Sequence, residues 1–537
     1  MADSYIDNAL MIVYDITIMA LLIFSSKKGT QDMKFNPLKN EVLDFCAPQS
    51  EKVWVSAFTS SDVASYNAHV LDIRAQGFKM INSYELSDNT FAFFKKGKDS
   101  VRLAFYPGTK EIKIIYINDE EVPDFTSKRK QGVCDALFTQ IQPEDSGLSD
   151  VIRCDDGRFV IIDGGWEFEP EADKLINLMR EQSPDKKPVI AAWIMTHPHL
   201  DHYRAFFEFY RKYKDDVIIE KFLYNFPEAK EENLERIPAM GTQEEMENLQ
   251  KLESIIKKEG YPLFMLHTGD VFDIAGLHFE VLSSPDDTMK PPVECFNRYS
   301  LILKVTFKGQ VLLLCADADF ELAKFGERWG RYLKSDILQI PHHGFGGGRE
   351  EEYDLIDPSV CFCPTEEDIG FMKYNIYTSY NKHLIYDLNV KDYFTAKETV
   401  TIKLPYTPGK YGRQILDEKI AQYQKAAGAK NWYFDSVTKD DATFTFINTT
   451  MIKIPVYADL YFDDPAKSVV AIKVEIPGGT RCQKNLFDEN DADPDALYFN
   501  RNSLAKIGVE DGAEFAVRLY SDYPFVASWK KDAIYHS

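Results

Sequence analysis

The stretch THPHLDH, Thr196 to His202, holds three of the ten histidines of this 537-residue chain, with one aspartate among them. It follows VIAAWIM, residues 189–195, a continuous apolar run that is typical of a strand buried on both faces. The stretch DHYRAFFEFYRKYKDD, residues 201–216, has the apolar periodicity of an amphipathic helix. The histidines are therefore expected on a loop between a buried strand and a helix, where functional residues often lie.

The residue types in this loop suit a metal ion. His197 and His199 are two residues apart, so in an extended loop both imidazoles can reach one ion. Asp201 and His202 begin the helix and can turn toward a second position. Imidazole nitrogens and carboxylate oxygens suit Zn²⁺, Mn²⁺ or Fe, and a set without cysteine is unlike a closed structural zinc site. The loop therefore predicts a catalytic type of metal site, with room for water.

Three further strand ends carry histidine or aspartate. PHHG, Pro341 to Gly344, follows the apolar run DILQI and places two histidines after another buried strand. LLLCADAD, residues 312–319, ends an apolar strand in Asp317. Upstream, IIDGG, residues 161–165, ends a strand in an aspartate and two glycines.

With these motifs in this order, the region from about Val133 to Tyr406 resembles the metallo-β-lactamase superfamily of metallohydrolases. The resemblance implies an α/β fold, a four-layer αββα sandwich. It implies two divalent ions as cofactors, with Zn as the first choice and Mn or Fe as alternatives. It assigns metal binding to His197, His199, Asp201, His202, Asp317, His342 and His343, with Asp317 bridging the ions.

The strand before Asp317 departs from the family pattern. The family usually has a histidine there, but ECFNRYSLILKV, residues 294–305, has Asn297. The form Asn-x-x-Ser-Leu with Pro-His-His-Gly is similar to the subgroup that contains the hydrolase domain of DNA-uptake channel proteins and the phosphorylcholine esterases. We therefore expect one of His342 and His343 to replace the missing ligand, while the other keeps the usual role. The rival ligand is His267 in LHTGD, which also follows a strand.

Two other residues have alternative interpretations. Asp163 either steadies a ligand imidazole or only forms the turn before two glycines. His278 alternates with apolar neighbours in LHFEV, which indicates a structural role. A second departure from the family, Cys315-Ala316 where glycine is common, is expected to alter the geometry of the loop before Asp317.

The predicted function follows from the metals. Two cations about 3.5–4 Å apart hold a shared water, and the resulting hydroxide attacks a phosphorus or carbonyl centre. Asp201 and Asp317 are the predicted catalytic carboxylates. The subgroup resemblance favours a phosphodiester, hence a small-molecule substrate. The alternatives are hydrolysis of a lactone, thioester or β-lactam, a nuclease, a non-catalytic binding protein, and a flavodiiron-type redox centre, for which the sequence has no phosphate-cradling glycine loop.

Charge and cysteine content restrict the partners and the compartment. The formal charge is -23, from 85 acidic and 62 basic residues, and such a field repels nucleic acid without excluding a local basic cleft. None of the eight cysteines forms a Cys-x-x-Cys pair, which favours reduced cysteines in a cytoplasmic protein. The oligomeric state has no signal in the sequence.

Four regions are predicted along the chain. Residues 1–32 form an apolar extension, 33–130 a small α+β module, 131–406 the hydrolase domain, and 407–537 a helix followed by a β-rich module. The apolar run Ala9 to Phe24 contains Asp15 and is shorter than the roughly 20 residues of a spanning helix, so no stable membrane span is expected. It is a packed helix, a weak membrane anchor, or an extension upstream of a true start at Met33.

Overall fold

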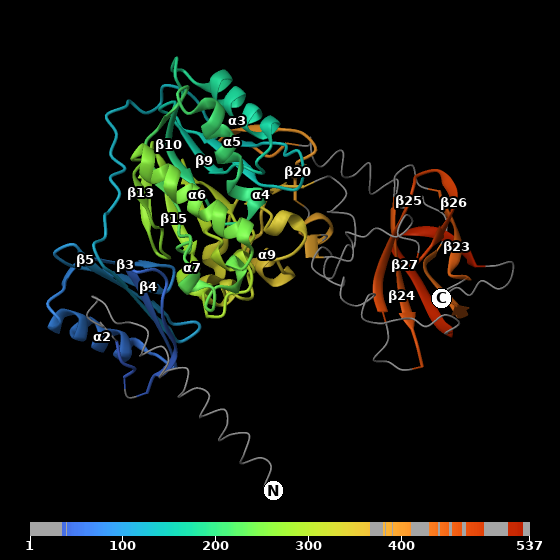
Figure 1. Cartoon of the computed structure of the whole chain (residues 1–537), viewed down its shortest axis with the longest axis horizontal. Coiled ribbons are helices and arrows are strands. Elements are labelled where there is room, and N and C mark those ends of the chain that lie inside the picture. Colours follow the sequence, from blue (N-terminus) through green and yellow to red (C-terminus); the bar gives the residue numbers. More distant parts are fainter. Residues whose placement is uncertain are drawn as a thin grey trace, which may run out of the picture.

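The structure is a computed structural model (Figure 1). It describes residues 35–38, 40–365, 380–381, 383–388, 390–409, 429–438, 441–449, 454–463, 469–487 and 514–529. The predicted apolar extension, residues 1–32, and the helix predicted after residue 407 lie outside the described residues. The predicted boundaries of the four regions stay predictions. Within the described part, no helix is long and apolar enough to cross a membrane.

The first unit is a six-stranded antiparallel sheet with one helix on one face (Figure 1). Asp62 caps this helix by accepting a hydrogen bond from the backbone N–H of Ser65, and Tyr66 and Ile73 pack on the sheet. The strand order is β1-β2-β6-β5-β4-β3, which leaves β1 and β3 as edges. The elements are β1 (Val42–Pro48), β2 (Val53–Thr59), α2 (Val63–Ala75), β3 (Lys79–Leu86), β4 (Asn89–Lys96), β5 (Asp99–Tyr106) and β6 (Glu111–Ile117).

Two mixed sheets form the centre of the molecule and pack face to face. Phe138, Ile162 and Ala192 of the first sheet share one apolar core with Phe279 and Leu303 of the second. The first sheet contains β7 (Ala136–Gln140), β8 (Ser149–Arg153), β9 (Phe159–Asp163), β10 (Val189–Ile194), β11 (Ile218–Ile219), β12 (Phe222–Leu223), β13 (Leu263–Phe264) and β21 (Val400–Leu404). The second contains β14 (Val271–Ile274), β15 (Leu277–Ser283), β16 (Ile302–Phe307), β17 (Gln310–Leu314), β18 (Ile337–Gln339), β19 (Val360–Cys363) and β20 (Asp392–Thr395).

Helices cover the outer face of each central sheet (Figure 1). One core contains Leu175 and Leu252 with Trp193 of β10, and another contains Phe325 and Tyr353 beside β17 and β18. These four layers confirm the predicted αββα sandwich. The helices on the first sheet are α3 (Glu169–Gln182), α4 (Leu200–Tyr203), α5 (Ala205–Tyr213) and α6 (Gln243–Glu259). Those by the second sheet are α7 (Pro285–Thr288), α8 (Phe325–Trp329) and α9 (Glu350–Ile356).

The helix predicted over residues 201–216 is divided into α4 and α5. Two backbone groups that would hold the helix together bond elsewhere. The carbonyl of Asp201 accepts from Leu148 N–H at 3.2 Å, and Ala205 N–H donates to the carbonyl of Gly165 at 2.9 Å. The break therefore comes from hydrogen bonds to the neighbouring loops. These hydrogen bonds also fix the direction of α4.

The last unit is β-rich, with the strand order β25-β24-β27-β23-β26 and β22 paired with β27. Its longest strand, β27 (Glu514–Trp529), pairs along its length with three different strands. Buried aromatic side chains, including Phe434, Phe444 and Phe525, fill its core. The other strands are β22 (Ala429–Thr438), β23 (Thr443–Asn448), β24 (Ile454–Tyr461), β25 (Val469–Ile476) and β26 (Thr480–Asn485).

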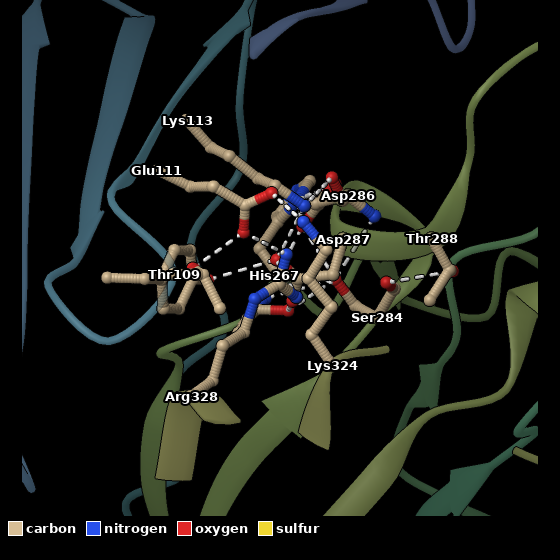
Figure 2. A network of polar contacts seen from close by, with 12 residues as sticks. Thr109, Glu111, Lys113, His267, Ser284, Asp286, Asp287, Thr288, Lys324 and Arg328 are labelled. Carbon is tan, nitrogen blue, oxygen red and sulfur yellow. Dashed lines mark hydrogen bonds and ion pairs between the residues drawn. The ribbon is translucent and has the colours of Figure 1, made fainter. Parts of the chain in front are cut away.

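A buried network of charged side chains joins the first unit to the central sandwich (Figure 2). Asp287 of α7 accepts from Lys113 Nζ at 2.9 Å and from the Tyr106 hydroxyl at 3.0 Å, and Arg328 Nη1 lies 3.1 Å away. Arg328 also donates to Glu111 at 2.9 Å. Burial, together with the nearby guanidinium of Arg328, lowers the pKa of Lys113 to about 8. We call these side chains the seam network.

The substitution Asp287→Ala is expected to destabilise the protein by about 3–5 kcal/mol, because it removes the carboxylate paired with the buried ammonium of Lys113 and one of the two carboxylates beside the buried Arg328. The exposed carboxylate of Asp273 provides the control, and Asp273→Ala is expected to cost within about 0.5 kcal/mol. The urea midpoint of the transition that unfolds these two units measures both changes. Equal midpoints for the two variants would show that the seam network contributes nothing to stability.

Candidate metal centre

Four strand ends of the two central sheets meet at one edge of the sandwich. β9 and β10 are parallel neighbours in the first sheet, and β17 and β18 are parallel neighbours in the second. The carboxyl ends of parallel neighbours lie at the same edge, so the loops that follow them converge. These loops carry the residues that the sequence singled out: Asp163, His197, His199, Asp201, His202, Asp317, His342 and His343.

One donor group consists of Asp201, His202, Asp317 and His343, whose ligand atoms all lie within 4.8 Å of one another. His343 Nε2 is 3.0 Å from Asp201 Oδ2 and 3.4 Å from Asp317 Oδ1. His202 Nε2 is 3.3 Å from the same oxygen of Asp317 and 3.2 Å from His343 Nε2. Two imidazoles and two carboxylates are thus aimed at one small volume.

A second donor group consists of His197, His199 and Asp317, again within 4.8 Å of one another. His197 Nε2 is 3.0 Å from His199 Nδ1 and 3.7 Å from Asp317 Oδ2. The two oxygens of Asp317 therefore face different groups, Oδ1 the first and Oδ2 the second. The carboxylate of Asp317 therefore lies between the two donor groups.

The two histidines of PHHG have different surroundings. The His343 side chain is buried and belongs to the first group, whereas that of His342 is 29% exposed and lies in neither group. His342 Nε2 is 3.8 Å from Asp317 Oδ2 and 3.3 Å from Asn297 Nδ2. Both histidines have positive φ, 50° and 51°, and this left-handed backbone turns consecutive side chains toward different sides of Asp317.

The donor set fits a divalent cation. Asp317 Oδ1 is buried and has no well-formed hydrogen bond within the described part of the chain, which is costly for a carboxylate unless a cation lies beside it. Burial raises the pKa of Asp317, but His343 and His202 hold it well below its ordinary value, so the group is ionised. Burial lowers the pKa of His199 to about 4, which leaves that imidazole neutral and able to donate a lone pair.

Asp163 orients His202 and closes the loop before it. One oxygen accepts from the backbone N–H of Thr196 at 2.7 Å, and the other lies 2.7 Å from both the Thr196 hydroxyl and His202 Nδ1. This contact leaves His202 Nε2 for the first donor group. Asp163 also has a φ of 60° at the end of β9, so it combines the two roles that the sequence left open.

The other two histidines considered from the sequence lie outside both donor groups. His267 is buried beside the seam network, where its Nδ1 is 3.0 Å from Asp286 Oδ2 (Figure 2). His278 is on β15, partly exposed, with its Nδ1 2.9 Å from Asp273 Oδ1. The structure therefore gives no support to His267 as the replacement ligand.

Gln339 is a site residue that the sequence prediction missed. Its side-chain Oε1 accepts from the backbone N–H groups of Cys315 and Ala316 at 2.7 and 2.8 Å, immediately before Asp317. Ala316 has a φ of 48°, and its carbonyl accepts from the backbone N–H of His342 at 2.8 Å. Gln339 thus holds the Asp317 loop in place. The signal that could have found it is a glutamine among apolar residues in the buried run ILQI, residues 337–340.

The substitution Gln339→Leu is expected to weaken metal binding about 10–100-fold, because two buried N–H groups lose their acceptor and the Asp317 loop can shift. Gln310 is the matched control. It lies at the start of β17, at the opposite end of the strand from the Asp317 loop, and its side chain forms two hydrogen bonds with the backbone of Tyr406. Gln310→Leu is expected to leave metal affinity unchanged. Titration of metal-stripped protein with Zn²⁺ measures both variants, and equal affinities would contradict the positioning role of Gln339.

Residues 143–344 match the family model described as the metallo-beta-lactamase superfamily. This chain therefore contains a domain of the metallo-β-lactamase superfamily. Domains of this superfamily bind metals and are generally hydrolytic, and the two donor groups are compatible with a metal-dependent hydrolase. The family model does not test the subgroup that Asn297 and PHHG suggest, so that assignment stays a prediction.

Several known proteins are similar to parts of this chain. YhfI from Bacillus subtilis, a metallo-beta-lactamase fold protein, is 9% identical with a TM-score of 0.31, over 50% of this chain and 100% of that one. Zn²⁺-bound PqqB from Methylobacterium extorquens is 13% identical with a TM-score of 0.28, over 48% and 87% of the two chains. Unliganded yeast PDE1 is 10% identical with a TM-score of 0.29, over 50% and 100%.

One curated relative matches a short segment. The probable B''epsilon regulatory subunit of serine/threonine protein phosphatase 2A from Arabidopsis thaliana is 32% identical over 122 residues, which are 20% of this chain. The match spans 22% of the length of that relative.

Proposed function

We propose that this protein is a hydrolase with two divalent metal ions. Asp201, His202, Asp317 and His343 would hold one ion, and His197, His199 and Asp317 would hold the other. Zn is the first choice, with Mn or Fe as alternatives. The observation that carries the proposal is the position of Asp317, whose two oxygens face two separate donor groups.

Three aspartates of the site would have different roles in the reaction. Ions bound here would supply Lewis acidity and lower the pKa of a nearby water. Asp317 would fix the spacing of the two positions and orient the attacking water through its carboxylate. Asp201 is the more exposed of the two carboxylates, at 20% for its side chain, so it can accept a proton at the open side of the site. Asp163 keeps His202 in one tautomer.

We infer that the substrate is a small phosphodiester. His342 is partly exposed beside Asp317, and the amide of Asn297 lies next to it. These two side chains can donate hydrogen bonds to phosphoryl oxygens as charge develops on them. The Asn-x-x-Ser-Leu and Pro-His-His-Gly motifs point to the same chemistry through their resemblance to phosphorylcholine esterases. The net charge of -23 disfavours a long polyanionic substrate.

The free cysteines support a cytoplasmic location as part of this proposal. All eight lie in the described part of the chain, and none is in a disulfide. Disulfides are rare in reducing compartments, so their absence among eight cysteines fits the cytoplasm.

A substrate panel tests the proposal. Purified protein supplied with Zn²⁺ or Mn²⁺ is assayed with aryl phosphodiesters, lactones, thioesters and a chromogenic β-lactam. We expect turnover of the phosphodiesters, and a decrease of about 10–100-fold in His342→Ala but not in His278→Ala, a partly exposed histidine outside the site. Hydrolysis of a carbonyl substrate without phosphodiester turnover would contradict the proposed phosphodiester substrate but would remain consistent with the proposed metal centre.

A further inference from the structure

A cavity of about 550 Å³ lies outside the metal centre, where the first unit meets the central sandwich. Its lining includes Phe93 and Arg102 of the six-stranded sheet, Val122 after β6, Asp270 before β14 and Val271 of β14. Volumes of this size are typical of ligand-binding sites, which often lie between structural units. The remaining lining comes from one strand, β3, through Ile81, Asn82, Tyr84, Glu85 and Leu86.

The strand beside the cavity is an open sheet edge. β3 pairs only with β4, and within the described residues no backbone hydrogen bond joins it to any other segment. Most of its side chains are exposed or half-buried, and it has eight residues. Proteins usually protect such an edge, because its free N–H and C=O groups can pair with another extended chain.

Exposed aliphatic side chains gather around this edge. Ile81 is 60% exposed, Val122 is 54% exposed and Val271 is 39% exposed, and all three line the same cavity. They come from three segments that are far apart in the sequence. Large exposed aliphatic groups that converge on one cavity are a mark of an interaction site.

Contacts between the first unit and the central sandwich hold the residues around the cavity in position. Tyr84 donates to the carbonyl of Gly269, and Arg102 forms an ion pair with Asp270. The backbone N–H of His267 donates to Asp270 at 2.9 Å, and the imidazole of His267 contacts Asp286, the chain neighbour of Asp287 in the seam network (Figure 2). The cavity is therefore a preformed site and needs no reorganisation of the two units.

The charges at the cavity favour a cationic ligand. Arg102 is neutralised by its contacts with Asp270 and Glu120. Glu85 is among the residues that line the cavity, and its carboxylate has no ion pair among the described residues. A lysine or arginine at the rim would complement this surplus of negative charge.

We propose that this cavity and the β3 edge bind an extended peptide segment of a partner protein. The peptide adds a strand antiparallel or parallel to β3, places an aliphatic side chain among Ile81, Val122 and Val271, and presents a basic side chain to Glu85. Backbone pairing supplies affinity, and the side-chain pockets supply specificity, as in other cases of strand addition. The site is separate from the metal centre.

The test uses the full-length protein and a fluorescein-labelled peptide of sequence TVKVTVT, titrated at physiological salt. We expect saturable binding that weakens at least tenfold in Val271→Arg and in Val122→Arg. Val63→Arg is the matched control, since Val63 is 61% exposed on α2 and does not line the cavity, and its affinity should equal that of the unmodified protein. Hydrogen exchange of the β3 amides should slow when the peptide binds.

Two altered peptides separate strand addition from general attraction to an acidic protein. Replacing the central valine by proline removes a backbone donor, and replacing lysine by glutamate reverses the charge; each should weaken binding at least fivefold. Absence of saturable binding, equal weakening in Val63→Arg, or unchanged exchange of the β3 amides would overturn the proposal.

Discussion

The substitution Asp317→Asn is expected to lower hydrolysis on the order of 10³-fold, the upper end of the cost of removing one electrostatic group from a catalytic site. The neutral amide has only one oxygen, whereas the two oxygens of Asp317 face two donor groups. Bound metal should fall from about two ions per chain to one or fewer. Elemental analysis and turnover of an aryl phosphodiester measure the two effects.

Asp319→Asn provides the control for this experiment. Asp319 lies two residues later, where its carboxylate accepts from the backbone N–H groups of Glu321 and Leu322 and belongs to neither donor group. An asparagine there can still accept these hydrogen bonds, so metal content and activity should stay close to those of the unmodified protein. Full metal content in Asp317→Asn would contradict the shared role of Asp317.

The second large effect separates the two histidines of PHHG. His343→Ala is expected to lose one metal ion and nearly all activity, because His343 Nε2 lies within 3.4 Å of both carboxylates in the first group. His342→Ala should keep both ions and lose activity about 10–100-fold, because His342 lies in neither group. Metal content of each variant is measured alongside its turnover.

His267→Gln is the comparison that decides between the two candidate replacements for the missing family histidine. His267 contacts Asp286 beside the seam network and belongs to neither donor group, so its substitution should leave the metal content unchanged. Loss of metal in His267→Gln, with full metal content in His343→Ala, would refute the assignment of the first donor group.

Much of the central fold could be predicted from local sequence. The apolar runs before THPHLDH, CADAD and PHHG are the strands β10, β17 and β18. Six of the seven predicted ligand residues form the two donor groups at the ends of these strands, and His342 lies in neither group. The division of the helix after His202 could not be predicted, because it depends on hydrogen bonds from Leu148 and to Gly165, which lie far away in the sequence.

The finer parts of the site also depend on long-range contacts. Which histidine of PHHG joins the first donor group is set by positive φ at both residues, and neither residue type signals that backbone. The bond from Gln339 to the Asp317 loop and the pairing of Lys113 with Asp287 join segments that local patterns treat separately. Sequence therefore predicted the ligand types, while tertiary packing decides their arrangement.

The most direct test of the two-ion centre is the metal content of the purified, dialysed protein, measured by inductively coupled plasma mass spectrometry beside the double variant His199→Ala/His202→Ala. We expect about two Zn or Mn ions per chain in the unmodified protein. The double variant removes one imidazole from each donor group and should lose most of this metal. Stoichiometric metal retained by the double variant would contradict the site.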